Sequence, residues 1–345
     1  MPLIKDEFKA ANVAGYYTAA SEGVDQTIGQ KLFPVRKQQG LNLSFIKGAN
    51  QKPIVLRPSA FDVKATFRDR MTIQMNELQM PYFKEGMAIK EEDRQQLLIV
   101  EQTKNQVLID QVVNTIMNDQ IQLVSGAHAR LEAMRMQVLA TGKLAVDFNG
   151  VAWDYDYGVG EANKGNAATP WAEEGAKPLE DILNAVAALE ELGSNAEVIV
   201  MNSKTFNLLK NAQSTIDAIN PLTKTKVTKK ELNEYLNDEH GIAIHVVSNT
   251  YIDDDGEVKK YFPDGAVTIM PNMAVGNTVF GTTPAEADLT SGQNLNVALV
   301  DTGIAVVSET TTDPVNTQTI VSMVALPSFE GVDLVYMLNV GLPNV

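Results

Sequence analysis

The amino-acid sequence predicts an α+β protein, and three patterns in its 345 residues support this fold class. Residues 61–76 alternate apolar and polar side chains, which is typical of a β-strand with one buried face. Residues 103–141 repeat apolar side chains at helical spacing. From Pro178 onward, short helical and strand patterns alternate, as they do in an α/β domain.

Residues 1–38 are predicted to form an extended arm with one short helix. Small and polar side chains dominate from Ala10 to Gln30, and the hydrophobic periodicity there is weak. A first strand is predicted at Leu41 to Phe45, because apolar residues alternate with polar ones. Turn-forming residues then follow from Lys47 to Pro53.

The alternating run at 61–76 is the most informative feature of the sequence. Ordinary strands have about 5–6 residues, whereas this run at about 3.3 Å per residue would span roughly 50 Å. Only Asp69 interrupts the alternation. Few domains of this size can cover such a strand with their own core, so we expect its apolar face to pack on another copy of the chain.

Charge is distributed unevenly along the sequence. The whole chain has a formal net charge of −15, but residues 31–70 carry nine basic and only two acidic side chains. A basic segment on an acidic chain favours docking onto a second copy, although a basic surface without a partner is the simpler alternative. The candidate intersubunit residues are Lys52, Arg57, Phe61, Val63, Lys64, Phe67, Arg68, Asp69 and Arg70. We expect the arginines at 68 and 70 to meet acidic residues of the neighbour.

The helical pattern at 103–141 predicts one long helix. Thr103 is a candidate N-cap, and Gly142 follows the last periodic residue as a C-cap would. A helix of about 39 residues would be roughly 58 Å long, and Ser125-Gly126 marks an expected bend. Its single apolar stripe indicates a spine beneath a sheet rather than a coiled coil.

The second half of the sequence predicts a helix from Pro178 that ends at Gly193 and a capping box from Thr228 to Glu231 that opens another helix. Strands are expected at 197–201, 242–247, 267–270, 297–300, 304–308, 320–326 and 332–339, with a hairpin between Tyr251 and Tyr261.

The composition excludes several functional classes. An acidic chain gains nothing from phosphate neutralisation, so sequence-specific DNA binding is not expected, although an acidic wall could enclose DNA without adhering to it. The absence of cysteine excludes disulfides, thiolate catalysis and cysteine zinc sites. The N-terminus has no signal-peptide pattern, and no stretch is apolar enough to predict a membrane span.

No motif in the sequence predicts a catalytic or cofactor-binding residue. The three histidines lack the i, i+4 spacing of a helical metal pair. Asp253, Asp255 and Glu257 are weak candidates for a metal site, because clustered carboxylates suit Ca²⁺. Their spacing is not that of an EF-hand, and a solvated turn is the favoured interpretation.

The order of these elements resembles the major capsid proteins of tailed bacteriophages, most closely the lambda-type capsid protein E family with its Hong Kong phage capsid fold. The motifs that carry the resemblance are Leu32-Phe33-Pro34, the segments 82–86 and 198–206, the hairpin at 251–262 with Pro263-Asp264-Gly265, and the segments 324–327 and 333–336. The resemblance covers nearly the whole chain, and the order of the motifs is its most specific part.

The resemblance implies five structural parts. These are an N-terminal arm at 1–38, an extended β-hairpin loop at 39–96, a spine helix with a peripheral β-sheet at 97–178, an α/β axial domain at 179–325, and C-terminal strands at 326–345 that return to the peripheral domain. The chain lacks the long cleavable leader of some relatives, which favours a separate scaffolding protein.

The resemblance also implies a function. The expected protein is not an enzyme and needs no cofactor. It self-assembles into pentamers and hexamers of an icosahedral shell that encloses double-stranded DNA without sequence-specific binding. Its expected partners are copies of itself, a scaffolding protein, a portal and a decoration protein, with no membrane. It is expected in the virion, after assembly in the host cytoplasm.

Two alternatives remain open from the sequence. The first is an encapsulin-like nanocompartment shell, which has the same fold but encloses an enzyme instead of a genome. The second is an acidic α/β enzyme that depends on a metal bound by the run beginning at Asp253. Co-purified DNA or protein cargo would separate the shells, and calorimetry with divalent ions would test the enzyme.

Overall fold

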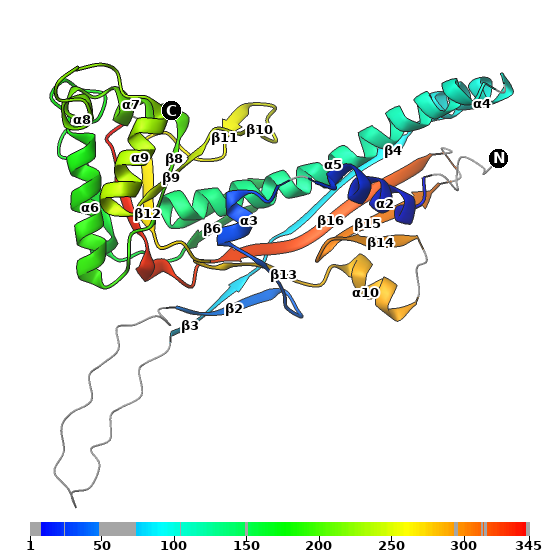
Figure 1. Ribbon diagram of the computed structural model, residues 1–345. Helices are drawn as coiled ribbons and strands as arrows, with labels where there is room; N and C mark the ends of the chain where they lie inside the picture. Colours follow the sequence, from blue (N-terminus) through cyan, green and yellow to red (C-terminus); the bar gives the residue numbers. More distant parts are fainter. Residues whose placement is uncertain are drawn as a thin grey trace, which may run out of the picture. The chain divides into compact units, whose positions relative to one another are not determined.

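The computed structural model describes residues 8–23, 25–47, 74–103, 105–148, 151–292, 296–311, 313 and 316–342 (Figure 1). It is an α+β structure, which confirms the predicted fold class. The chain forms two compact units. The first comprises Met1–Leu43, Glu77–Arg135 and Asn277–Ser328, and the second comprises Ser44–Asn76, Met136–Gly276 and Phe329–Val345.

The first unit is built on a six-stranded sheet. Its strands are β1 (Val35–Lys37), β13 (Asn277–Phe280), β16 (Thr317–Ser328), β15 (Ile304–Thr310) and β14 (Val297–Val300) in that order, with β4 (Tyr82–Ile89) also paired to β16. Only the β1–β13 pair is parallel. The long strand β16 therefore joins early and late parts of the chain, because Tyr82 pairs with Val324 and Ile89 pairs with Thr317.

Helices complete the first unit. They are α2 (Ala10–Ser21), α3 (Ile28–Leu32), α4 (Glu91–Gln102), α10 (Pro284–Ser291) and the larger part of α5 (Gln106–Thr141). Helix α2 packs on β14 and β15 through buried Val13 and Ala14. A capping box at Thr27 and Gln30 begins α3, since each side chain accepts a hydrogen bond from the other residue's backbone N–H.

The second unit contains a five-stranded sheet in the order β7 (Lys164–Asn166), β17 (Tyr336–Asn339), β12 (Ala266–Met270), β8 (Val198–Asn202) and β9 (Ala243–Val247). Its helices are α6 (Pro178–Leu192), α7 (Ser203–Asn211), α8 (Gln213–Ile219) and α9 (Lys229–His240). Short 3₁₀ turns lie at η1 (Glu161–Asn163) and η2 (Val332–Leu334). Strands β8 and β9 are parallel, so their carboxyl ends meet at one edge.

Two hairpins and one further strand pair lie outside the large sheets. The hairpins are β5–β6 (Lys143–Phe148, Val151–Asp156) and β10–β11 (Thr250–Ile252, Val258–Lys260), and the pair is β2–β3 (Asn42–Lys47, Gln74–Gln79). Among the described residues, none of the helices combines the length and apolar character that crossing a bilayer requires.

Local sequence signals explain the helices of the second unit. Pro178 occupies the first turn of α6, and Gly193 ends it with φ +90°. Thr228 and Glu231 form the predicted capping box of α9. The apolar faces of these helices and one face of β8 meet in one core, which includes Ile182, Leu189, Ile199, Met201, Leu236 and Ile269.

The structure differs from the sequence prediction at the long helix. The pattern indicated a helix over 103–141; α5 ends at Thr141 as expected but begins at Gln106, and the separate helix α4 ends at Gln102. The Thr103 hydroxyl donates to the Val100 carbonyl at 2.6 Å, and the Asn105 side chain accepts from the Val107 N–H at 3.2 Å. These side-chain hydrogen bonds end one helix and begin the next.

The expected division into five parts also differs from the strand pairing. The axial part was expected at 179–325, but β13, β14, β15 and β16 lie in the sheet of the first unit. The strand expected at 332–339 is a 3₁₀ turn followed by β17, which pairs on one side with β12 and on the other with β7, within the range 97–178 of the expected peripheral part. Residues 61–73 lie outside the described residues, so the long strand stays a prediction.

Candidate functional site

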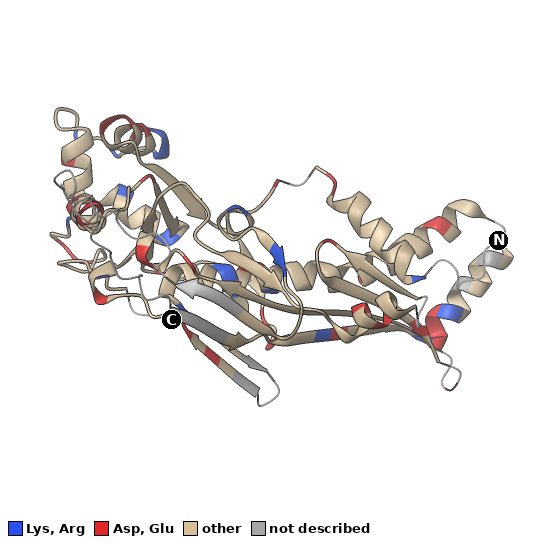
Figure 2. Ribbon diagram, turned by 90° about the horizontal axis from the view of Figure 1, so that it is seen from below, with Lys and Arg blue, Asp and Glu red and all other residues tan. Residues whose placement is uncertain are grey.

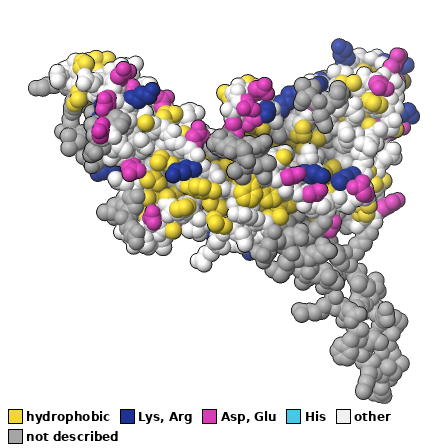
Figure 3. All heavy atoms as spheres, turned by 180° about the vertical axis from the view of Figure 1, so that it is seen from behind, with side chains coloured by type: hydrophobic (Ala, Val, Ile, Leu, Met, Phe, Trp, Pro, Cys, Tyr) yellow, Lys and Arg dark blue, Asp and Glu magenta, His cyan; other side chains and the backbone are white. Residues whose placement is uncertain are grey.

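Large apolar side chains are exposed on several separate elements. Figure 3 shows one face of the molecule, on which hydrophobic side chains lie exposed among charged ones. Leu222 is the most exposed of these residues, at 96%. Single exposed apolar residues are ordinary, but exposed apolar groups on projecting elements are typical of contact surfaces.

The hairpin β10–β11 is one such element. Ile252 pairs directly with Val258 across the hairpin, and their side chains are 73% and 70% exposed. Tyr251 and Tyr261 lie with ring centroids 4.9 Å apart at its base. A two-stranded ribbon is marginally stable alone, so a partner that covers this apolar pair would stabilise it.

The weak metal candidates lie at the turn of the same hairpin. Asp253 accepts a hydrogen bond from the Asp254 N–H at 2.8 Å and forms an ion pair with Lys259. This pairing raises the pKa of Lys259. In the part of the chain that the structure describes, no three histidine or acidic side chains converge as metal ligands would. Asp253 therefore acts in this structure as a turn-forming, ion-paired residue.

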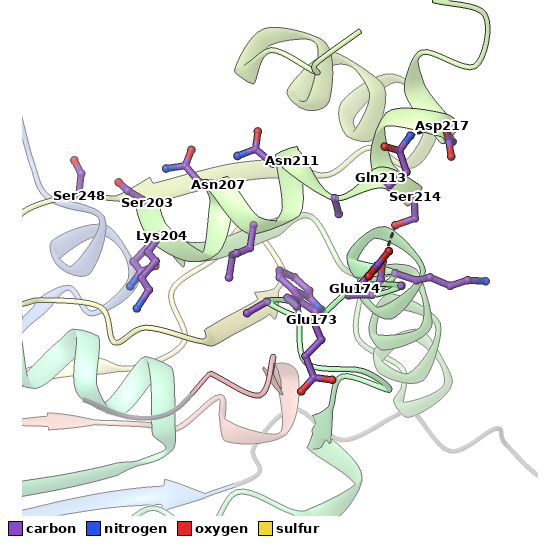
Figure 4. Close-up of a pocket in the computed structure, with 18 of the residues that line it drawn as sticks. Glu173, Glu174, Ser203, Lys204, Asn207, Asn211, Gln213, Ser214, Asp217 and Ser248 are labelled. Carbon is purple, nitrogen blue, oxygen red and sulfur yellow. Dashed lines mark hydrogen bonds between the residues drawn. The ribbon is translucent and has the colours of Figure 1, made fainter. Parts of the chain in front are cut away.

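A groove lies in the second unit at the carboxyl ends of β8 and β9 (Figure 4). It has a volume of about 1030 Å³. Figure 4 shows Ser203, Asn207 and Asn211 in a row along α7. We call it the α7 groove. Its lining residues are Trp171–Lys177, Asn202–Lys204, Asn207, Leu208, Asn211–Ser214, Asp217, Val247, Ser248 and Lys260.

The floor of the α7 groove is held by a buried carboxylate. Trp171 is 3% exposed, and its indole N–H donates to Asp181 at 2.9 Å. The other Asp181 oxygen accepts from the Ala168 N–H at 3.3 Å. Across the groove, the Ser214 hydroxyl donates to the Ala176 carbonyl at 3.0 Å, which ties α8 to the segment that carries Glu173 and Glu174. The groove is therefore a formed feature of the unit.

The loop between α8 and α9, residues 220–227, presents Leu222 to solvent, and we call it the Leu222 loop. Its backbone is fixed by the Lys224 N–H, which donates to the Asn220 carbonyl at 2.9 Å. Lys224 adopts φ +49°, a left-handed conformation that is uncommon for a residue with a side chain. Val227 is 2% exposed and anchors the end of the loop in the core.

In the first unit, a buried ion pair fixes the N-terminal segment. Arg135 donates to Glu132 at 3.3 Å and to the Thr278 hydroxyl at 2.8 Å. Glu132 also accepts hydrogen bonds from the Thr27 hydroxyl and the Gly29 N–H. Burial lowers the pKa of Arg135, while Glu132 partly opposes this shift. The pair therefore joins α3, α5 and β13.

His128 lies on the same helix as this ion pair. Its ring stacks on Tyr17 of α2 at a centroid distance of 5.4 Å, and its Nε2 lies 3.1 Å from Asp301 Oδ2. Burial lowers the pKa of His128; Asp301 partly opposes the shift, and the charge of Arg135 lowers the pKa further. The partly buried histidine therefore contacts both the N-terminal helix and the β14–β15 turn.

Residues 10–340 match the family described as phage major capsid protein E. The chain belongs to this family. The predicted resemblance is therefore confirmed, and so is its main functional consequence: this capsid protein is a structural protein of a phage shell. The family places it in the virion and is not a class of enzymes.

Solved structures share the fold of the capsid protein at low sequence identity. The capsid protein of a prophage of E. coli CFT073 has 15% identity and a TM-score of 0.60, with 96% of this chain and 99% of that chain covered. A phage-related protein of Bordetella bronchiseptica RB50 has 15% identity and a TM-score of 0.56, with 95% and 97% covered. The capsid asymmetric unit of cyanophage A-1(L) has 14% identity and a TM-score of 0.50, with 90% and 91% covered. No curated protein sequence matches the capsid protein significantly.

All nine candidate intersubunit residues of the capsid protein, from Lys52 to Arg70, lie outside the described residues, so their role stays a prediction. Sequence reasoning missed the α7 groove, the Leu222 loop and the buried pair of Glu132 and Arg135. The pair had a usable signal, since opposite charges at i, i+3 interrupt the apolar stripe of a helix. Leu222 had no such sequence signal, because it is a single apolar residue between Pro221 and the polar residue Thr223.

Proposed function

We propose that the capsid protein assembles into pentamers and hexamers that close into an icosahedral shell around double-stranded DNA in the host cytoplasm. The family match over residues 10–340 is the observation that carries this proposal. Copies joined by head-to-tail contacts form closed rings, and rings of two sizes permit a closed shell.

The charge of the chain supports DNA as the contents of the shell. Its net charge is −15, and acidic residues occur on helices and loops of both units (Figure 2). A wall of the same sign as DNA does not adhere to it, so the packaged molecule stays free to leave. Binding to the DNA sequence is not part of the proposal.

The basic segment 31–70 supports docking between subunits. In this proposal the part of the 39–96 loop that precedes β4 lies across a neighbouring subunit, while β4 itself stays paired with β16 of its own chain. The double variant Arg68→Glu/Arg70→Glu should then reduce shell formation while leaving the melting temperature of the isolated subunit nearly unchanged. Equal loss of both properties would contradict the docking role.

The test of the proposed function is to produce the capsid protein together with other head proteins of the same phage, namely a scaffolding protein, a portal and a decoration protein, and to image the product by electron microscopy. The expected result is closed particles that protect double-stranded DNA from nuclease. Particles that enclose only protein would support a nanocompartment instead. A subunit that stays monomeric under all of these conditions would refute the assembly proposal.

A further inference from the structure

We propose that the Leu222 loop of one capsid protein docks in the α7 groove of a neighbouring copy, with Leu222 on the apolar floor of the groove. This inference rests on the proposed function, because it requires copies that stand side by side in a ring. It adds a named contact, with a donor loop and an acceptor groove on the same unit.

The loop has the properties of an inserting element. Leu222 is 96% exposed, so it does not occupy the groove of its own chain. Hydrogen bonds fix the loop shape: the Asn220 side chain donates to the Thr225 carbonyl at 3.3 Å, and the hydroxyls of Thr223 and Thr225 lie 3.1 Å apart. A loop that is already ordered loses little conformational entropy when it binds.

The groove has a matching interior. Its volume of about 1030 Å³ exceeds that of one leucine side chain and admits the tip of a loop. The apolar residues Trp171, Ala172, Ala176, Leu208 and Ala212 line it. The amide and hydroxyl groups along α7 provide hydrogen-bond partners for the backbone of an entering segment (Figure 4).

Charge favours the same pairing. Three lysines line the groove, but Lys177 pairs with Glu180, and both Lys204 and Lys260 pair with Asp264. Among the described residues, no ion pair joins the lining carboxylates Glu173, Glu174 and Asp217 to a basic side chain. The Leu222 loop carries Lys224 and Lys226 and no acidic residue. The loop and the groove therefore have complementary charge.

The arrangement produces a ring rather than a symmetric pair. The loop and the groove are different surfaces of one unit, and α8 leads from the groove at Gln213 to the loop at Asn220. Contacts between two different surfaces are heterologous and repeat from copy to copy until the ring closes. Near the axis of a ring, the two sides of each subunit lie close together. A donor loop and an acceptor groove that are near each other on one unit therefore suit a place close to the axis.

Disulfide trapping tests the contact directly, because the natural chain contains no cysteine. The double variant Leu222→Cys/Ala172→Cys, oxidised within assembled particles, should give a ladder of covalent oligomers up to five or six chains on a non-reducing gel. The matched control is Leu222→Cys/Ala287→Cys, which moves the second cysteine to an exposed alanine of the first unit. A product that stays monomeric in both variants would overturn the inference.

Substitutions in the loop and in the groove, followed by measurement of assembly, provide an independent test. Leu222→Ser should raise the protein concentration needed for assembly by about tenfold, as expected when the burial of one leucine is lost. Lys224→Glu/Lys226→Glu should have a similar effect, and Glu173→Lys/Glu174→Lys in the same chain should restore assembly. The control Lys229→Glu/Lys230→Glu, on the exposed first turn of α9, should assemble normally.

The outcomes separate this inference from the proposed function. If the natural chain forms no particles with its head proteins, the proposed function fails. If the natural chain assembles and the variants of Leu222, Lys224 and Lys226 assemble equally well, the docking inference alone is wrong. Restored assembly in the chain that carries the exchanged charges would support both the proposed function and the docking inference.

Discussion

The carboxylate of Glu132 accepts a hydrogen bond at 3.1 Å from the backbone N–H of Gly29, a residue 103 positions earlier in the chain. The same carboxylate is the counter-ion of Arg135. One buried side chain thus holds the start of the chain against α5 and neutralises a buried cation, and both roles can be tested by substitution.

Glu132→Ala should destabilise the first unit by about 3–5 kcal/mol, because it leaves Arg135 buried without a counter-charge. Chemical denaturation measures the loss, and faster tryptic cleavage at Lys31 would report the release of α3. The control Glu180→Ala breaks the exposed pair with Lys177 and should cost less than about 1 kcal/mol. Equal losses in the two variants would contradict the anchoring role.

Gly29→Ala should destabilise the protein by about 1–3 kcal/mol, the usual cost of overpacking. A methyl group at position 29 would lie 2.5 Å from a carboxylate oxygen of Glu132, which its hydrogen bonds hold in place. Gly15→Ala is the matched control, since nothing lies within 4 Å of a methyl group there. That change within α2 should stabilise by about 0.5–1 kcal/mol, so the two thermal shifts should have opposite signs.

Stability should fall as the pH drops through about 6.5, the pKa of an unfolded histidine. The folded-state pKa of His128 is lowered, so below this pH the unfolded chain binds a proton that the folded chain does not. His128→Phe should keep the stacking on Tyr17 and reduce the pH dependence of the melting temperature between pH 5.5 and 7.5. Native carboxylates with lowered pKa values, such as Asp156 and Asp264, lose their contribution only near pH 4, outside this window.

Asp181→Ala should cost about 1–3 kcal/mol in the second unit, because the indole N–H of Trp171 and the N–H of Ala168 lose their acceptor. The chain has two tryptophans, so Trp153→Phe leaves Trp171 as the sole indole reporter in a fluorescence-monitored unfolding experiment. If Asp181→Ala leaves the native fluorescence maximum of Trp171 unchanged at a short wavelength, Asp181 does not fix the floor of the α7 groove.

Local signals made some elements predictable. Contacts within a few residues define both ends of α6, at Pro178 and Gly193, and the start of α9, at the Thr228–Glu231 box. The structure places these three boundaries as predicted. Helix α4 was missed, although Glu91, Glu92 and Asp93 occupy its first turn, where acidic residues are favourable.

Strand partners were not predictable from the sequence. The segments 320–326 and 332–339 look alike, yet β16 pairs with β4, β13 and β15, whereas β17 pairs with β12 and β7. Partner choice depends on contacts between distant parts of the chain, which no local pattern encodes. The α7 groove was missed for the same reason, because residues as distant as Trp171, Asn207 and Ser248 line it.

The pairing of β4 with β16 also sets an order of events during protein synthesis. Strands β1 and β4 leave the ribosome early, but their partners β13 and β16 are made only after residue 276. The central strand of the first unit is complete only when Ser328 has been translated. A chain that is interrupted before this point lacks that strand, so only a finished subunit can present a complete first unit to a growing shell.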